Sequence, residues 1–142
     1  MRKFIMLLLL FSCCIFAKEK PEAHIIGDTY LGIIGSSITL EFNQAICTLS
    51  SSGNESTQEF KINFSCGDMK QSIWHNDLST VDVDEPRFEL LWAGDMDGDG
   101  KLDLKMDTSP KYSCTQQTTY LSSLALDGLL VGVSEQSQLK CR

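Results

Sequence analysis

Short runs in which apolar and polar residues alternate recur along the chain and predict β-strands. Phe60, Ile62 and Phe64 take every second position of one such run, with polar residues between them. Because successive side chains of a strand point to opposite faces of its sheet, this run predicts a strand with one buried face. No stretch shows a helical period of comparable quality.

Two later runs repeat the period of two. Phe88, Leu90 and Trp92 alternate with other residues in the first, and residues 102–106 form the second. We expect Trp92 to pack in the core with Phe88 and Leu90. An Asp- and Gly-rich segment separates the two runs, so they predict the two strands of a hairpin.

Turn-forming residues divide the chain between these runs. Asp127-Gly128 lies between the apolar runs 118–126 and 129–133 and predicts a two-residue hairpin turn. The serine-rich residues 49–57 predict an exposed loop. Without repeats or a linker, residues 18–142 predict a single all-β domain, a small antiparallel β-sandwich or barrel.

The N-terminal residues have the layout of a signal peptide. Arg2 and Lys3 precede the apolar residues 4–16, and Ala17 offers a small residue for cleavage. The apolar run is shorter than the roughly 20 residues of a transmembrane helix. Residues 1–17 therefore predict export to the periplasm or the cell exterior. Lipid anchoring at Cys13 or Cys14 stays open, since residues 10–13 loosely resemble a lipobox.

The charge balance narrows the possible partners. The 142-residue chain has 12 Lys plus Arg and 19 Asp plus Glu, a net charge of −7. Cleavage would remove Arg2 and Lys3 but no acid, which lowers the net charge to −9. The sequence has no basic cluster of the kind that nucleic acids require. Cations, neutral glycans or proteins are the expected partners.

Four cysteines would remain after cleavage, and they predict two disulfides. An even number of cysteines in an exported chain indicates a disulfide framework, here with three possible pairings. We favour the sequential pairing because each bond then closes a local segment. A zinc site would need closer pairs than this spacing offers. The four residues are Cys47, Cys66, Cys114 and Cys141.

The segment between the strands of the first hairpin has the spacing of a calcium loop. Calcium takes six to eight oxygen ligands, and every-other-residue spacing lets a curled loop turn several carboxylates to one point. Gly98 stands at position 6 of the loop, where a tight bend is needed. Lys101 at position 7 would offer its backbone carbonyl, and Asp107 is a further candidate donor on the exit strand. The carboxylates at positions 1, 3, 5 and 9 are Asp95, Asp97, Asp99 and Asp103.

This stretch resembles the Asp-x-Asp-x-Asp-Gly-x-x-Asp loops of EF-hands, dockerins and the FG-GAP repeats of integrin-type propellers. Met106 stands at position 12, where an EF-hand has a bidentate Glu, so a helix pair is not expected. The FG-GAP kind of loop, which joins two strands, fits residues 95–107 better. The chain also resembles uncharacterised bacterial exported proteins that share three of its stretches: Trp92-Ala93-Gly94-Asp95, Leu121-Ser122-Ser123 and a closing Cys141.

These patterns lead to a non-catalytic, exported β-domain that binds one calcium ion. The alternative interpretation of residues 95–107 is an acidic surface turn, since Asp and Gly are common turn formers. Against it, four carboxylates in nine residues repel one another without a cation. Magnesium is less favoured because it prefers rigid octahedral sites. An ion between two strands of a hairpin points to a structural role.

Two other function classes stay open. A small calcium-dependent hydrolase would need a catalytic base, for which His75 beside Trp74 is the candidate, but no nucleophile motif accompanies it. A secreted inhibitor or adhesin would present the 50–57 loop. Trp74 and Trp92 are weaker candidates for sugar stacking. A second cation site would use Asp82, Asp84 and Glu85.

Overall fold

The computed structural model describes residues 18–76 and 83–142. The predicted signal peptide, residues 1–17, and Asp82 lie outside the described residues. A single turn of 3-10 helix, η1 (Ser122–Leu124), follows β9. The strands in chain order are β1 (His24–Ile26), β2 (Ser37–Phe42), β3 (Ala45–Asn54), β4 (Glu59–Cys66), β5 (Met69–His75), β6 (Glu89–Gly94), β7 (Asp103–Asp107), β8 (Cys114–Thr115), β9 (Gln117–Leu121), β10 (Gly132–Gln136) and β11 (Lys140–Cys141).

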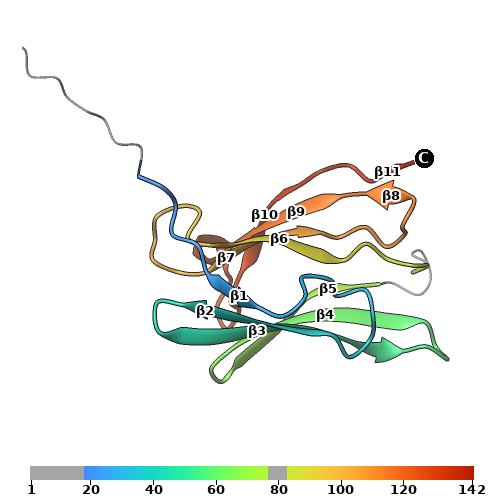
Figure 1. Ribbon diagram of the computed structural model, residues 1–142, viewed down its shortest axis with the longest axis horizontal. Helices are drawn as coiled ribbons and strands as arrows, with labels where there is room; N and C mark the ends of the chain where they lie inside the picture. The colour runs from blue at the N-terminus through green and yellow to red at the C-terminus, as the bar shows by residue number, and fades with distance from the viewer. Residues whose placement is uncertain (1–17, 77–82) are drawn as a thin grey trace, which may run out of the picture.

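The strands form two larger sheets that face each other as layers, together with a short ribbon (Figure 1). One sheet has the order β1-β2-β3-β4-β5, and the other has the order β10-β9-β7-β6. Strand β11 pairs with β8 in the ribbon, and all these strand pairs are antiparallel. The predicted all-β antiparallel fold is therefore confirmed, in its sandwich form.

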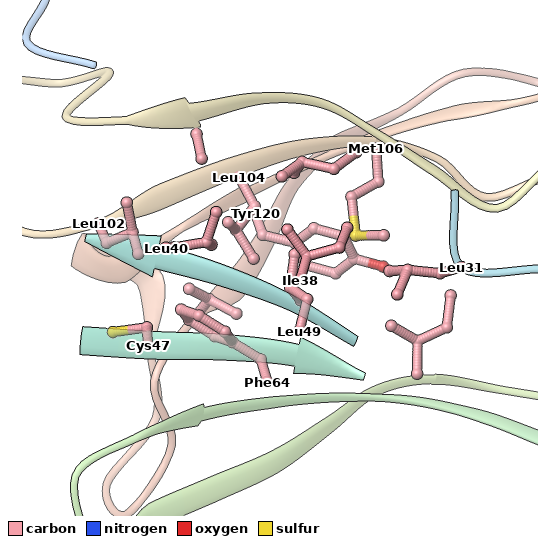
Figure 2. Close-up of a cluster of buried hydrophobic side chains, with 14 of the residues drawn as sticks. Leu31, Ile38, Leu40, Cys47, Leu49, Phe64, Leu102, Leu104, Met106 and Tyr120 are labelled. Carbon is pink, nitrogen blue, oxygen red and sulfur yellow. The ribbon is translucent and has the colours of Figure 1, made fainter. Parts of the chain in front are cut away.

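The core lies between the two layers and is filled from both (Figure 2). Leu40, Leu49 and Phe64 come from the five-stranded sheet, and Leu104 and Met106 come from the four-stranded sheet. All five side chains are buried. Burial of apolar surface is the main stabilising term for such a fold. In the strands that carry these residues, the apolar positions of the alternating runs are therefore the ones that face the core.

The N-terminal residues 21–31 close one side of the sandwich by pairing with both sheets. In the middle of this segment β1 pairs with β2 of the five-stranded sheet. On either side of β1 the chain pairs with β6 of the other sheet: the Ala23 N–H donates to the Ala93 carbonyl at 2.9 Å, and the Leu90 N–H donates to the Thr29 carbonyl at 2.9 Å. One segment thus ties the two layers together.

Gln71 ties the opposite side of the sandwich. Its Nε2 donates to the Val131 carbonyl at 2.9 Å, while its Oε1 accepts from the N–H groups of Leu130 and Val131 at 2.9 and 3.0 Å. Tyr120 adds a second link, since its hydroxyl donates to the Ile73 carbonyl at 3.1 Å. Burial raises the pKa of Tyr120 to about 12.

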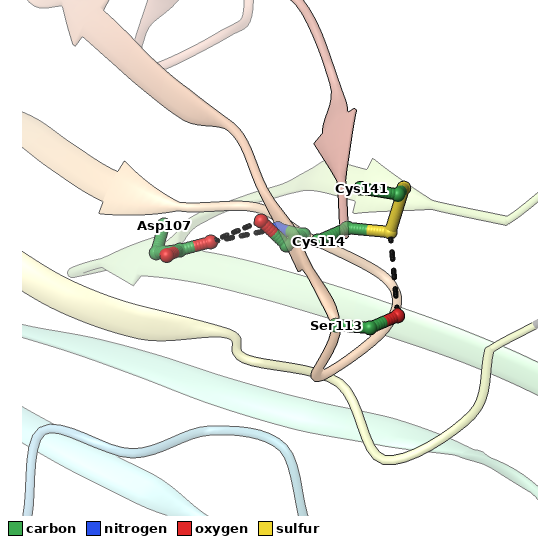
Figure 3. The surroundings of a disulfide bond; sticks show 5 residues. Asp107, Ser113, Cys114 and Cys141 are labelled. Atoms are coloured by element: carbon green, nitrogen blue, oxygen red, sulfur yellow. Dashed lines mark hydrogen bonds between the residues drawn. A yellow bond between two sulfur atoms is a disulfide. The ribbon is translucent and has the colours of Figure 1, made fainter.

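The two disulfides have the predicted sequential pairing. Cys47 on β3 bonds Cys66, its direct partner on β4. Cys114 on β8 bonds Cys141, its direct partner on β11 (Figure 3). The first bond joins neighbouring strands of the five-stranded sheet, and the second holds the C-terminal strand of the ribbon.

Trp92 does not enter the core, which corrects the prediction made from strand alternation. A register shift between Leu90 and Trp92 in the β6–β7 ladder turns the following residues over. Ala93 then takes the buried position, while the half-buried Trp92 donates its indole N–H to Glu22 at 3.1 Å. A β-bulge of this kind adds one residue to a strand and so reverses the faces beyond it.

The two-residue hairpin predicted at Asp127-Gly128 is also wrong. Strands β9 and β10 do pair, but residues 122–131 connect them and Leu121 pairs with Gly132. Asp127 and Gly128 form a turn within this connection, closed by a hydrogen bond from the Leu129 N–H to the Leu126 carbonyl. A turn does form at Asp127-Gly128, as predicted, but the paired residues nearest to it are Leu121 and Gly132 rather than its immediate neighbours.

The serine-rich residues 49–54 are strand rather than loop. They continue β3, and Ser50 to Asn54 pair with Asn63 to Glu59 of β4. Ser51 is buried, and its hydroxyl donates to the Ile33 carbonyl. A serine can occupy a buried strand position when its hydroxyl is bonded in this way, which the sequence does not reveal.

Candidate metal centre

The predicted loop joins the last residue of β6 to the first residue of β7. Gly94 and Asp103 are paired across this hairpin, so residues 95–102 form the loop, and residues 103–107 of the predicted 95–107 stretch belong to β7. Gly98 and Gly100 have φ values of +83° and +79°. Residues with a Cβ rarely adopt this left-handed conformation, so the two glycines allow the loop to curl on itself.

The curled loop brings four aspartates together. One carboxylate oxygen from each of them lies within 4.8 Å of the others. The first and last are buried, and the two between them are exposed. We call these residues the aspartate group: Asp95, Asp97, Asp99 and Asp103.

Asp95 organises the loop from its first position. Its Oδ1 accepts from the N–H groups of Gly98 and Asp99 at 2.7 and 3.1 Å, and its Oδ2 accepts from the Gly100 N–H at 2.8 Å. Hydrogen bonds from N–H groups stabilise the ionised carboxylate. Each oxygen has more than one lone pair, so these bonds leave acceptor capacity on Asp95.

Asp103 closes the loop from the start of β7. It is fully buried, and its Oδ2 accepts from the Met96 N–H at 2.7 Å. Its Oδ1 accepts from both the N–H and the hydroxyl of Ser122, at 2.8 and 3.0 Å. Asp103 therefore connects the loop to the chain that follows β9.

Two serines of η1 hold the aspartate group from outside the loop. The Ser122 hydroxyl also lies 3.0 Å from Asp99 Oδ2, and the Ser123 hydroxyl donates to Asp97. The hydrogen bond from Ser123 is the main reason that the pKa of Asp97 is lowered. Sequence reasoning noted the Leu-Ser-Ser stretch but assigned these serines no role.

Lys101 and Asp107 were the two further candidates. The exposed Lys101 donates its backbone N–H to Asp99 Oδ1 at 2.9 Å. Asp107 lies at the other end of β7, where its Oδ1 accepts from the Ser109 N–H at 3.0 Å and its Oδ2 lies 3.3 Å from Arg87 Nε. The aspartate group does not include Asp107.

Neither the ion pair of Lys61 with Glu59 nor that of Arg87 with Asp107 involves a member of the aspartate group. Two unit charges about 5 Å apart repel by about 1 kcal/mol in bulk water and by more where they are buried. The group could therefore hold a metal ion.

The loop also contacts the other sheet. Asn43 lies in the β2–β3 turn, and its Nδ2 donates to the Gly100 carbonyl at 3.0 Å. A largely apolar cavity of about 300 Å³ adjoins this contact, with Phe42, Phe64 and Leu102 among its lining residues. The loop thus touches both layers of the sandwich.

The remaining candidate residues lie in separate places. His75 ends β5, opposite Lys61 of β4, and is exposed. Trp74 packs against Phe88, with ring centroids 4.5 Å apart. Asp84 donates its backbone N–H to the Pro110 carbonyl at 3.0 Å.

No family model, curated protein or solved structure matches this chain. Within residues 18–76 and 83–142, the structure contains no helix long and apolar enough to cross a membrane.

Proposed function

We propose that the protein is a non-catalytic, exported β-domain that binds one calcium ion in the loop after β6. The observation that carries this proposal is the aspartate group, four carboxylates within 4.8 Å of one another at the closed end of a hairpin. The ligands are its four carboxylates and the backbone carbonyl of Lys101. Water would complete the six to eight oxygens that calcium takes.

The charge and donor types favour a hard cation. Carboxylate oxygens are the ligands of calcium and magnesium, whereas the described loop offers no imidazole or thiolate. Calcium tolerates irregular, many-oxygen sites, while magnesium prefers a regular octahedron with several waters. The resemblance to Asp-x-Asp-x-Asp-Gly loops favours calcium as well.

The ion has a structural role in this proposal. The loop is bonded to η1 through Ser122 and to the β2–β3 turn through Asn43. An ion that fixes the loop therefore also fixes its contacts with both sheets. Two disulfides support export, because such bonds persist in oxidising compartments.

Thermal unfolding with and without metal tests the proposal. We expect 10 mM calcium to raise the Tm of the disulfide-bonded protein by about 5–10 °C relative to chelator, if the Kd lies in the 10⁻⁴–10⁻³ M range of extracellular sites. The same concentration of magnesium should raise it less.

A matched pair of variants locates the ion. Asp97 and Asp127 are both exposed, and each precedes a glycine in a turn. Asp97→Ala removes the side-chain oxygen and should abolish most of the calcium shift, whereas Asp127→Ala should keep it. An equal shift with magnesium would contradict calcium as the ion. No shift with either metal, or its loss in Asp127→Ala, would contradict the site itself.

A further inference from the structure

A second pocket lies beside the β8–β11 ribbon and collects positive charge. It has a volume of about 390 Å³. Three cationic residues line this one pocket, although the chain as a whole has a net charge of −7. The pocket is lined by Arg87, Tyr112, Ser113, Thr115, Lys140, Cys141 and Arg142.

The ribbon places Lys140 and Arg142 directly across from Thr115 and Ser113, which both carry hydroxyl groups. Lys140 is the direct partner of Thr115 across the β8–β11 ladder. The Arg142 N–H donates to the Ser113 carbonyl at 3.0 Å, which extends the ladder by one step. Lys140 and Arg142 are two residues apart, so an extended chain directs both side chains to the same face.

The Cys114–Cys141 disulfide keeps this arrangement in place. Figure 3 shows this bond, and Cys141 stands between Lys140 and Arg142 in the chain. The strand β11 has only two residues, and both are exposed, so without the disulfide little burial would hold it against β8. The covalent bond therefore fixes the two cations at the C-terminal strand relative to β8.

Arg87 completes the pocket from the segment before β6. Its Nε lies 3.3 Å from Asp107 Oδ2, and its guanidinium lies 5.9 Å from the centroid of the Tyr112 ring. These contacts orient the planar group at the pocket wall. Asp107 offsets one of the three charges. Even with an α-carboxylate at Arg142, the pocket stays net positive.

We propose that this pocket binds a phosphate-type oxyanion, carried by a small phosphate compound or by a phospholipid head group. Two guanidinium groups and an ammonium supply more N–H donors than the two oxygens of a carboxylate can use. The tetrahedral phosphate group has three or four acceptor oxygens and a charge near −2. The volume leaves room for an organic substituent beside the Tyr112 ring.

Titration with inorganic phosphate, followed by backbone amide NMR shifts, tests the pocket. The experiment uses the disulfide-bonded protein with chelator present and at constant ionic strength, so the aspartate group does not contribute. We expect saturable shifts centred on residues 113–115 and 140–142, and much weaker shifts with acetate. Absence of saturation, or acetate binding as tightly as phosphate, would overturn the proposal.

Paired charge variants assign the binding to this pocket. Lys140→Gln/Arg142→Gln should weaken phosphate binding at least tenfold. Lys61→Gln/Lys70→Gln makes the same change of charge on β4 and β5 and should leave the affinity within twofold. Equal weakening by both pairs would show only the effect of net charge and would overturn the proposal. Intact disulfides and unchanged far-UV circular dichroism confirm folding.

Vesicles distinguish the two sources of the phosphate group. Phosphatidylcholine vesicles with and without phosphatidic acid are sedimented with the wild-type protein and with both variant pairs. Co-sedimentation that requires phosphatidic acid, Lys140 and Arg142 assigns the lipid head group. Binding of inorganic phosphate without co-sedimentation assigns a soluble phosphate compound.

Discussion

Asp103 is fully buried although it is an acid, and it accepts hydrogen bonds from Met96 and Ser122. Asn at this position would keep one acceptor oxygen. Its NH₂ group would replace the other oxygen and would face an N–H donor with which it cannot form a hydrogen bond. We predict that Asp103→Asn lowers the free energy of unfolding by about 1–2 kcal/mol in chelator, because a lost acceptor outweighs the relief of repulsion in the aspartate group.

The loss should grow when calcium is present, since Asp103→Asn also removes a proposed ligand. Urea unfolding with calcium and with chelator measures both values. Asp127→Asn is the control, because Asp127 is exposed and should stay within about 0.5 kcal/mol of wild type. Equal stability of the two variants in both conditions would contradict the role given to Asp103.

Tyr120 should make the free energy of unfolding decrease as the pH becomes alkaline. Its pKa is raised by burial from 10.0 to about 12, so the folded state favours the neutral phenol. That contribution is complete below pH 10 and is lost as the pH rises from 10 through 12. We predict a loss of about 2–3 kcal/mol across this window, measured by urea unfolding at closely spaced pH values.

Phenylalanine at position 120 separates this effect from other titrations. Tyr120→Phe should cost about 1 kcal/mol at pH 7, because the Ile73 carbonyl loses its donor, and should remove most of the loss above pH 10. Tyr112→Phe, at a residue 71% exposed, should behave like wild type. Persistence of the full alkaline loss in Tyr120→Phe would refute the assignment.

At this scale the sequence predicted the aspartate group but not the residues that hold it. Asp95 and Asp103 lie within one short motif, so their spacing alone brings them together. Ser122 and Ser123 follow a different strand, and only the pairing of β7 with β9 carries them to the loop. Their sequence context contains no signal that a carboxylate is near.

Among the elements, the end of the connection between β9 and β10 is held by a side chain of the other sheet. Gln71 bonds the backbone of Leu130 and Val131 at three points. We predict that Gln71→Ala lowers the free energy of unfolding by about 1–3 kcal/mol, because the two N–H groups and one carbonyl lose partners.

Hydrogen exchange shows where the Gln71 contribution acts. The amides of Leu130 and Val131 should exchange much faster in Gln71→Ala, while amides of β3 and β4 keep their protection relative to the global stability. Gln138→Ala changes an exposed residue outside the strands and serves as the control. Unchanged protection at Leu130 and Val131 would contradict this link.

Strands were predicted correctly where the apolar residues alternate along the strand and only one face of the strand packs on the core. The apolar residues of the runs 60–64 and 102–106 are buried as expected, although Asn63 and Asp103 between them are buried too. Prediction failed where a ladder shifts or extends, as at Trp92 and at residues 49–54. Bulges and buried serines depend on the partner strand, so a single strand's sequence does not specify them.

The whole molecule joins its two sheets through a shared core and through residues 21–31, which pair with both. We therefore predict that both sheets unfold in one cooperative transition. Each sheet contains one of the chain's two tryptophans, Trp74 in β5 and Trp92 in β6. Fluorescence of Trp74→Phe and Trp92→Phe proteins reports on one sheet at a time.

The test of this prediction is whether different probes give the same unfolding midpoint within each variant protein. The fluorescence and far-UV circular dichroism midpoints should agree in both variants, and the calorimetric and van't Hoff enthalpies should be equal. The midpoints of the two variants themselves will differ, since Trp74 packs on Phe88 and Trp92 does not enter the core. Two separate transitions in one protein would show that the sheets are independent.

By itself, the sequence determined the strand class and the acidic loop, and among three possible disulfide pairings it favoured the one that forms. These features depend on residues close together in the chain: period-two alternation, cysteines that close short segments, and aspartates with a glycine at a bend. Tertiary structure decided which serines reach the loop, which tryptophan packs against the core, how residues 21–31 join the sheets, and how Arg87 comes to line one pocket with Lys140 and Arg142. These contacts join distant segments, and only the packing of one sheet against another, with its registers and bulges, determines them.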